Sequence, residues 1–130
     1  MAAESKSVVR TEAAPAPFQG APYSQAIAAR GFVFVSGQLG LKPDGDRIEG
    51  GIVEQTEQIC QNLRAILEAA GTGLDRLVKT TVFLIDLDDF SAMNEVYASY
   101  VGSSPPARST VQVAALPSGA RVEIEAIASL

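Results

Sequence analysis

Residues 77–85, LVKTTVFLI, form an apolar and β-branched run between two segments with helical patterns. An apolar run of this length, bounded by more polar sequence, is typical of a strand that is largely buried in a sheet. The side chains alternate between the two faces of such a strand, and this run is apolar at Val82 and Leu84 and also at Phe83 and Ile85. The segment therefore predicts a strand with an apolar side chain on each face.

A helical pattern lies on each side of this strand. Apolar residues recur at three- and four-residue spacing over residues 52–70, which predicts an amphipathic helix that ends at Gly71. A second helix is expected after Asp88 or Asp89, either of which can cap it, and before Gly102.

The remaining strands are predicted from β-forming residues between turn signals. We expect the last two strands to pair antiparallel through their turn, and the first two to meet at Arg30-Gly31. The order is then β-β-α-β-α-β-β, an α/β (α+β sandwich) fold with two helices on one face of a mixed sheet. The predicted strands are residues 24–29, 32–36, 108–115 and 121–129, with a turn at residues 117–119 and a short edge strand possible at residues 7–11.

Length and composition predict one globular domain over residues 1–130. No apolar run approaches the roughly 20 residues of a membrane-spanning helix, and residues 1–16 lack the apolar core of a secretory signal. The single cysteine, Cys60, excludes an intrachain disulfide and indicates a reducing compartment, which favours a cytoplasmic protein. The net charge of −5 weighs against a nucleic-acid backbone as the main ligand.

The chain has no histidine. This excludes Ser-His-Asp and Cys-His catalytic arrangements and every histidine-ligated metal site. An enzyme of this composition must act through Arg, Glu, Asp, Tyr, Ser, Thr and backbone groups, so we expect neither a metal nor an organic cofactor.

The strongest candidates for chemistry are Arg108 and Glu123. Glu123 and Glu125 share one face of an otherwise apolar strand, where they either face a cleft or interface or discourage aggregation at a sheet edge. Arg108 directly follows Pro105-Pro106-Ala107, and a guanidinium fixed in this way suits bidentate capture of a carboxylate. The alternative is an Arg108–Glu123 ion pair that joins two neighbouring strands.

Other positions carry weaker signals. The Ser36-Gly37 step at the end of a strand allows close approach of a ligand to the backbone, and Tyr23 can form an aromatic wall or pack on the core. Asn94 lies on the second helix, and Cys60 lies on the apolar stripe of the first, as an inert core residue would. The strands are apolar on both faces, since Phe32 and Phe34 alternate with Val33 and Val35, and Phe83 and Ile85 with Val82 and Leu84. With no helix to cover the second face of the sheet, we expect an oligomer.

These segments together resemble the Rid family, the reactive-intermediate deaminases of the YjgF type, also called L-PSP endoribonucleases. The resemblance extends from about residue 16 to residue 128 and is strongest to the RidA subgroup, which keeps the arginine. The motifs that carry it are residues 22–26 (PYSQA), 35–38 (VSGQ), 57–63 (EQICQNL), 78–84 (VKTTVFL), 88–90 (DDF), 93–97 (MNEVY), 106–109 (PARS) and 122–126 (VEIEA).

The resemblance implies a chorismate-mutase-like homotrimer with active sites in clefts between subunits. It implies cofactor-independent hydrolysis of 2-enamine and 2-imine acids, such as 2-aminoacrylate and 2-iminopropanoate, to a 2-oxo acid and ammonia. Arg108 would hold the substrate carboxylate and Glu123 would position or activate water. The family's substrate-binding positions correspond to Tyr23, Ser36, Gly37, Asn94 and Thr110.

Two residues depart from the family pattern: Ala21 stands where glycine is usual, and Thr110 where many bacterial members have cysteine. The second departure bears on substrate preference. Two other functions remain open at this point, an endoribonuclease or translation inhibitor and a non-catalytic module that binds small carboxylates.

Overall fold

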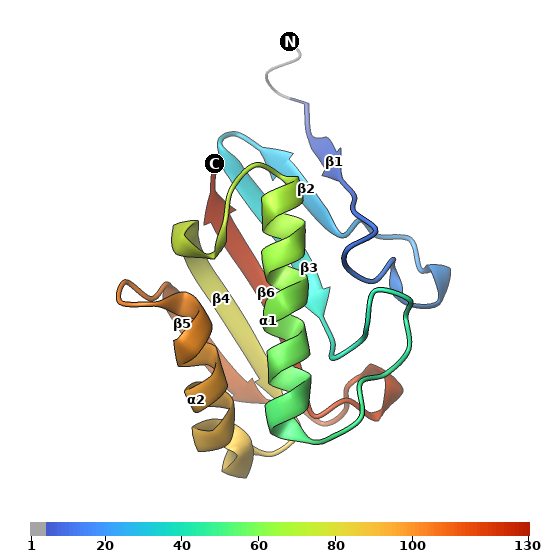
Figure 1. The fold of residues 1–130 in the computed structure, drawn as a ribbon, viewed down its shortest axis with the longest axis vertical. Coiled ribbons are helices and arrows are strands. Elements are labelled where there is room, and N and C mark those ends of the chain that lie inside the picture. The colour runs from blue at the N-terminus through green and yellow to red at the C-terminus, as the bar shows by residue number, and fades with distance from the viewer. Residues whose placement is uncertain (1–4) are drawn as a thin grey trace.

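The computed structural model describes residues 5–130 and contains a six-stranded mixed sheet with two helices (Figure 1). The strand order across the sheet is β1-β2-β3-β6-β4-β5. All pairs are antiparallel except β4 with β5, which is parallel. The strands are β1 (Ser7–Val9), β2 (Ala26–Ala29), β3 (Phe32–Gln38), β4 (Leu77–Leu84), β5 (Ala107–Gln112) and β6 (Val122–Ser129).

The two long helices, α1 (Ile52–Ala69) and α2 (Phe90–Val101), lie side by side on one face of this sheet (Figure 1). The predicted α+β fold is therefore confirmed, and the short strand β1 forms one edge of the sheet as expected. Arg30 and Gly31 both have positive φ angles, 54° and 82°. This conformation is the one that a two-residue hairpin turn between β2 and β3 requires.

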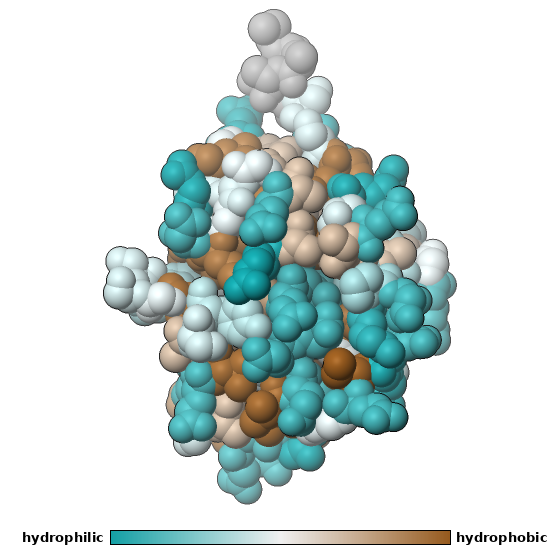
Figure 2. All heavy atoms as spheres, in the orientation of Figure 1, coloured by the Kyte–Doolittle hydropathy of each residue, from teal (hydrophilic) through white to brown (hydrophobic). Residues whose placement is uncertain are grey.

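The core lies between the helices and the covered face of the sheet. Val82 and Leu84 of β4 and Val122 and Ile124 of β6 are fully buried there, together with Ile66 of α1. On the outer side of the helices, hydrophilic residues cover much of the surface (Figure 2). Cys60 is buried, which raises the pKa of its thiol to about 12, so it is the inert core residue that the sequence predicts.

The opposite face of the sheet has no helix over it, and it is apolar. Phe32, Phe34 and Val111 are 40–45% exposed, and the two phenylalanine ring centroids lie 6.4 Å apart. Phe83 and Ile127 lie on the same face, since their neighbours along the strands are fully buried on the other. We call this surface the open face.

The expected pairing of the last two strands is wrong. β5 does not pair with β6, because β4 lies between them and pairs with both. The reason is the crossover through α2, which returns the chain beside β4 in the same direction, as strand–helix–strand connections do. The loop around residues 117–119 then takes the chain past β4 to the centre of the sheet.

The expected cap on the second helix is also wrong. Asp89 occupies the N-cap position of α2 but makes no capping hydrogen bond. Its carboxylate instead accepts hydrogen bonds from the Arg121 guanidinium, at 2.8 Å for the shortest. Asp86 caps the preceding short 3-10 helix, where its side chain accepts from the Asp88 backbone N–H.

Residues 5–130 contain neither a membrane-spanning helix nor a cluster of metal-ligating side chains. No helix in this range is both long and apolar enough to cross a membrane. In the same range, no group of three or more cysteine, aspartate or glutamate side chains is placed to hold a metal ion.

Candidate active site

Glu123 lies against the backbone of Gly37 on the neighbouring strand. The β3–β6 register shifts between Val35 and Gln38, so Ser36 and Gly37 bulge out of the ladder beside β6. A Cβ atom added to Gly37 would overlap the Glu123 carboxylate, and it would lie 3.1 Å from Cγ of the same side chain. Glycine is therefore required here for space, and the carboxylate is held next to an irregular stretch of backbone.

The Glu123 side chain is half-buried on the open face. Burial raises its pKa above the ordinary value of 4.5, and the negative charge of Glu125 raises it further. β6 is a central strand, so the alternative that these two carboxylates protect a sheet edge from aggregation is wrong. A carboxylate whose pKa is raised in this way is a better proton acceptor than an ordinary surface glutamate.

Hydrogen bonds connect the bulge to the segment that carries Tyr23. The Ser36 hydroxyl donates to the Ser24 carbonyl at 2.6 Å, and the Ser36 N–H donates to the Gln25 carbonyl at 2.9 Å. The phenol oxygen of Tyr23 accepts from the Phe18 N–H at 2.6 Å, and Tyr23 is 41% exposed. Tyr23 is thus a wall of a surface depression, and the alternative that it packs in the core is wrong.

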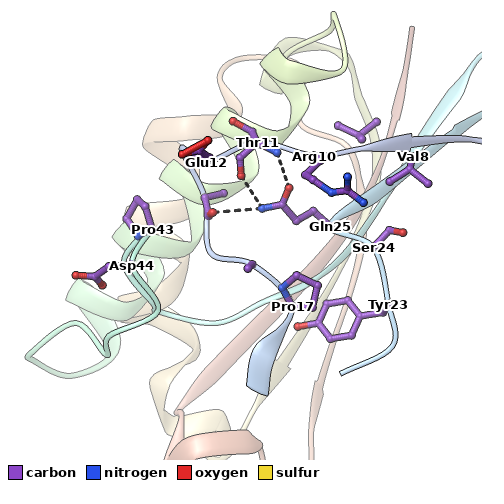
Figure 3. Close-up of a pocket in the computed structure, with 13 residues that line it drawn as sticks. Val8, Arg10, Thr11, Glu12, Pro17, Tyr23, Ser24, Gln25, Pro43 and Asp44 are labelled. Carbon is purple, nitrogen blue, oxygen red and sulfur yellow. Dashed lines mark hydrogen bonds between the residues drawn. The ribbon is translucent and has the colours of Figure 1, made fainter. Parts of the chain in front are cut away.

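That depression is a cavity of about 610 Å³ between the N-terminal segment and residues 23–25 (Figure 3). Its floor is organised by the buried amide of Gln25. The Gln25 side chain accepts from the Thr11 N–H at 2.7 Å and donates to carbonyls of Thr11 and Pro15 at 3.0 and 2.9 Å. The hydrogen bonds of Ser36 to Ser24 and Gln25 join Tyr23's segment to the bulge that holds Glu123, so we call Tyr23, Ser36, Gly37 and Glu123 the glutamate region; of these four, Tyr23 lines the cavity.

Arg108 belongs to a second region. It lies with Asn94, Tyr97 and Pro106 in a groove of about 370 Å³ between α2 and the start of β5. The guanidinium carbon of Arg108 is 4.9 Å from the ring centroid of Tyr97 and 5.5 Å from that of Phe90. We call this the arginine region.

Arg108 forms no ion pair with any carboxylate of residues 5–130, where the Arg121–Asp89 pair is the salt bridge observed. The alternative of an Arg108–Glu123 ion pair is therefore wrong. A guanidinium that is held by aromatic rings and lacks a carboxylate partner remains available to an anionic ligand.

Asn94 and Thr110 each have a buried polar atom with no hydrogen-bond partner. These atoms are Asn94 Oδ1 and Thr110 Oγ1, and Thr56 Oγ1 on α1 is the other such atom in the described part of the chain. Thr110 follows Arg108 by two residues on β5, so both side chains lie on the same face of the strand. Buried polar atoms without partners are uncommon, and a ligand with hydrogen-bond donors would satisfy the Asn94 oxygen.

The sequence patterns assign no role at the site to Tyr97, Phe90 or Gln25. The two aromatic residues fit the apolar stripe of α2, and nothing in their spacing distinguishes a ring over a cation from a core residue. Gln25 lies between strand-forming residues. The signal that could have identified Gln25 is its place directly before the strand-forming residues 26–29, since an amide that is buried there must find hydrogen-bond partners.

The Endoribonuclease L-PSP family model matches residues 11–130, which includes both regions. The chain belongs to the Rid family. It is 51% identical over 124 residues to a RutC family protein of Pyrococcus horikoshii, with 95% of this chain and 97% of that protein covered. It is 49% identical to the mouse protein named 2-iminobutanoate/2-iminopropanoate deaminase, with 95% and 90% covered.

Solved structures of this Rid chain's relatives have the same fold. One is E. coli TdcF with bound serine, which matches with a TM-score of 0.87 and 37% identity and covers 95% of this chain and 98% of that chain. The ligand named for that structure is an amino acid, a small molecule with one carboxylate.

Proposed function

We propose that this protein is a cofactor-independent hydrolytic deaminase of 2-enamine and 2-imine acids, which yields a 2-oxo acid and ammonia. The observation that carries the proposal is a pair of charged side chains, Arg108 and Glu123, that form no ion pair with each other. Arg108 has no carboxylate partner among residues 5–130, and Glu123 is a half-buried carboxylate with a raised pKa. Similarity to the mouse protein named 2-iminobutanoate/2-iminopropanoate deaminase supports this assignment.

The chemistry suits these two groups. Arg108 would bind the substrate carboxylate through parallel N–H donors and so fix the position of the neighbouring imine carbon. That carbon is electrophilic when the imine nitrogen is protonated, so water can attack it without a metal. Glu123 would accept a proton from the attacking water, which forms a carbinolamine.

The second half of the reaction returns the proton. Glu123 would transfer it to the amine nitrogen, and the C–N bond would break as the carbonyl of the 2-oxo acid forms. The departing ammonia takes up the proton of the carbinolamine hydroxyl and leaves as ammonium. Overall, one water is consumed and the carboxyl group of Glu123 ends in its starting state. An enamine substrate must first take a proton on its terminal carbon to become the imine.

The substrate would bind between subunits of a homotrimer. Arg108 and Glu123 belong to separate regions of one chain, which supports a site built from the arginine region of one subunit and the glutamate region of the next. The apolar open face supports assembly, because a surface of this kind is stabilised when another copy covers it.

A coupled assay tests the proposal. A pyridoxal-dependent dehydratase acting on serine or threonine would generate the imine, and appearance of the 2-oxo acid would be followed with and without this protein. Acceleration above the rate in buffer is expected. If the protein binds 2-oxo acids but leaves the rate unchanged, it is a carboxylate-binding module and the proposal is wrong.

The name of the matching family raises RNA cleavage as the other candidate. Metal-independent RNA cleavage commonly relies on acid–base pairs of histidine, and this chain has none. Its net charge of −5 also opposes binding of a phosphate backbone. Incubation with a structured and an unstructured RNA, with Glu123→Gln and Arg108→Ala purified in the same way as controls, would separate cleavage at this site from contamination.

A further inference from the structure

We propose that Tyr97 and Phe90 are positioning residues for Arg108, which hold its guanidinium by their aromatic rings so that the cation stays free of any carboxylate until an anionic substrate binds. This inference rests on the proposed function, because it assumes that Arg108 receives the substrate carboxylate. It adds two residues that were otherwise assigned to the apolar stripe of a helix.

The first support is the distance of the cation from two rings of one helix. The guanidinium carbon lies 4.9 Å from the Tyr97 centroid and 5.5 Å from the Phe90 centroid, both within the range of a cation–π contact. Tyr97 and Phe90 are seven residues apart on α2, two helical turns, so both project toward β5.

The second support is a hydrogen bond that holds the Tyr97 ring in place next to Arg108. Its hydroxyl forms a 2.6 Å hydrogen bond with Thr80 Oγ1, and both residues are buried. Thr80 is the register partner of Arg108 across the β4–β5 ladder. The ring that contacts the guanidinium is therefore anchored to the residue directly opposite the arginine backbone, which fixes the ring and the arginine relative to each other.

The third support is the charge around the arginine. A carboxylate partner would hold Arg108 equally well but would occupy the donors that a substrate needs. Aromatic faces attract the cation but are much weaker hydrogen-bond acceptors than a carboxylate. The guanidinium is therefore held in place while its N–H donors remain free for an anion. Tyr97 is 6% exposed and Phe90 is 41% exposed, so we expect Tyr97 to contribute more.

Tyr100 supplies a matched control on the same helix. Its ring centroid lies 5.0 Å from the Arg64 guanidinium carbon, and its hydroxyl donates to Glu57 at 2.6 Å. The contacts of Tyr100 thus resemble those of Tyr97 in kind but lie outside the groove that contains Arg108.

The experiment compares Tyr97→Leu, Phe90→Leu and Tyr100→Leu in the dehydratase-coupled assay, together with calorimetric binding of 2-oxobutanoate. We expect KM to rise about tenfold for Tyr97→Leu and a few-fold for Phe90→Leu, the scale of a cation–π contact, with a smaller change in kcat. Tyr100→Leu should leave both constants near wild type. Tyr97→Phe keeps the ring but loses its hydrogen bond to Thr80, so it should lower Tm and raise KM less than Tyr97→Leu does.

The inference is overturned if Phe90→Leu and Tyr97→Leu change only Tm, or if they change KM no more than Tyr100→Leu does. Phe90 is exposed enough that its variant keeps the test valid if Tyr97→Leu does not fold. If wild type binds 2-oxobutanoate but does not accelerate imine hydrolysis, the proposed function fails, and the binding constants still test the positioning role. If wild type neither binds nor turns over, both are wrong.

Discussion

The Arg108 and Glu123 side chains project from opposite faces of one sheet. Arg108 is the register partner of Thr80 on β4, and Glu123 is the register partner of Phe83 on the same strand. Thr80 faces the helices and Phe83 faces the other way, since they are an odd number of positions apart. One small substrate cannot contact both side chains of a single subunit, so a site that uses both requires two copies of the chain.

Mixed trimers test this arrangement. Arg108→Ala and Glu123→Gln are each expected to be inactive, but refolding an equal mixture should restore activity. Random assembly places an intact arginine region against an intact glutamate region at about a quarter of the interfaces. We therefore expect about a quarter of wild-type turnover, measured in the coupled assay.

The control is the same mixture combined without refolding, which should stay inactive while subunits do not exchange. A refolded mixture of two Arg108 variants, Ala and Lys, controls for the refolding step. Absence of recovery in a refolded mixture that contains verified mixed trimers would place both residues in one subunit's site or outside the site.

Substitution of Arg108 should affect binding and turnover together. Arg108→Ala removes the guanidinium that would bind the substrate carboxylate. It should lower kcat/KM by on the order of a hundredfold or more, since a misplaced substrate alone can cost that much. Arg108→Lys should recover little, because an ammonium lacks two parallel donors and stacks less well on Tyr97. Steady-state kinetics beside thermal melts would check this, and a variant that melts early but turns over normally would show a purely structural role.

The pH dependence should follow the Glu123 carboxyl. Its pKa is raised in the folded protein by burial and by Glu125. As the general base must be ionised, kcat/KM should fall as the pH is lowered through this raised value. Glu125→Gln removes one of the two causes, so it should move the acidic limb to lower pH with little loss at neutral pH. An unchanged limb in Glu125→Gln would contradict the assignment of the limb to Glu123.

The raised pKa of Glu123 also affects the stability of the folded protein. A carboxyl whose pKa is raised on folding stabilises the protein most below its ordinary pKa, and that contribution is lost as the pH rises through the raised value. Glu123→Gln should therefore lower kcat by roughly a hundredfold or more while raising Tm at neutral pH. The gain in Tm should disappear in acid, where Glu123 of the wild type is itself protonated.

Much of the fold was predictable from the sequence because it depends on local patterns. The spacing of Ile59, Leu63 and Ile66 predicts α1, and the run at residues 77–85 predicts β4. The order of strands in the sheet was not predictable from the turn at residues 117–119, because a turn between two strands does not show whether a third strand lies between them. That order depends on the crossover through α2.

The candidate site was predictable as residue types but not as geometry. Arg108 stood out because prolines precede it, and Glu123 because it is charged on an apolar strand. Their separation onto two faces depends on which residues of β4 they pair with. The contacts of Tyr97 depend on the packing of α2 against β5, which a helical pattern alone does not define.

Gly37→Ala should displace the Glu123 carboxylate without removing its charge. The added methyl group would occupy the space of the Glu123 carboxylate, whose side chain can move, so the fold should persist. We expect kcat/KM to fall about ten- to a hundredfold with a small change in Tm, as displaced catalytic groups lose rate steeply with distance. Gly51→Ala, where a Cβ meets no other atom within 4 Å and φ is −104°, controls for the loss of a glycine. Equal kinetic effects of the two substitutions would contradict the contact.

A charge on the open face should weaken assembly. Phe83 lies on that face beside Val111 and Glu123. Phe83→Lys would therefore place an unpaired ammonium in the proposed subunit interface, where desolvation of a charge is costly. Light scattering should show trimers for wild type at micromolar concentration and smaller species for the variant, with turnover lost in parallel. Val53→Lys, a charge at an exposed apolar position on α1, should leave both unchanged. A wild-type monomer, or a Phe83→Lys variant that remains a fully active trimer, would show that the open face does not form the interface.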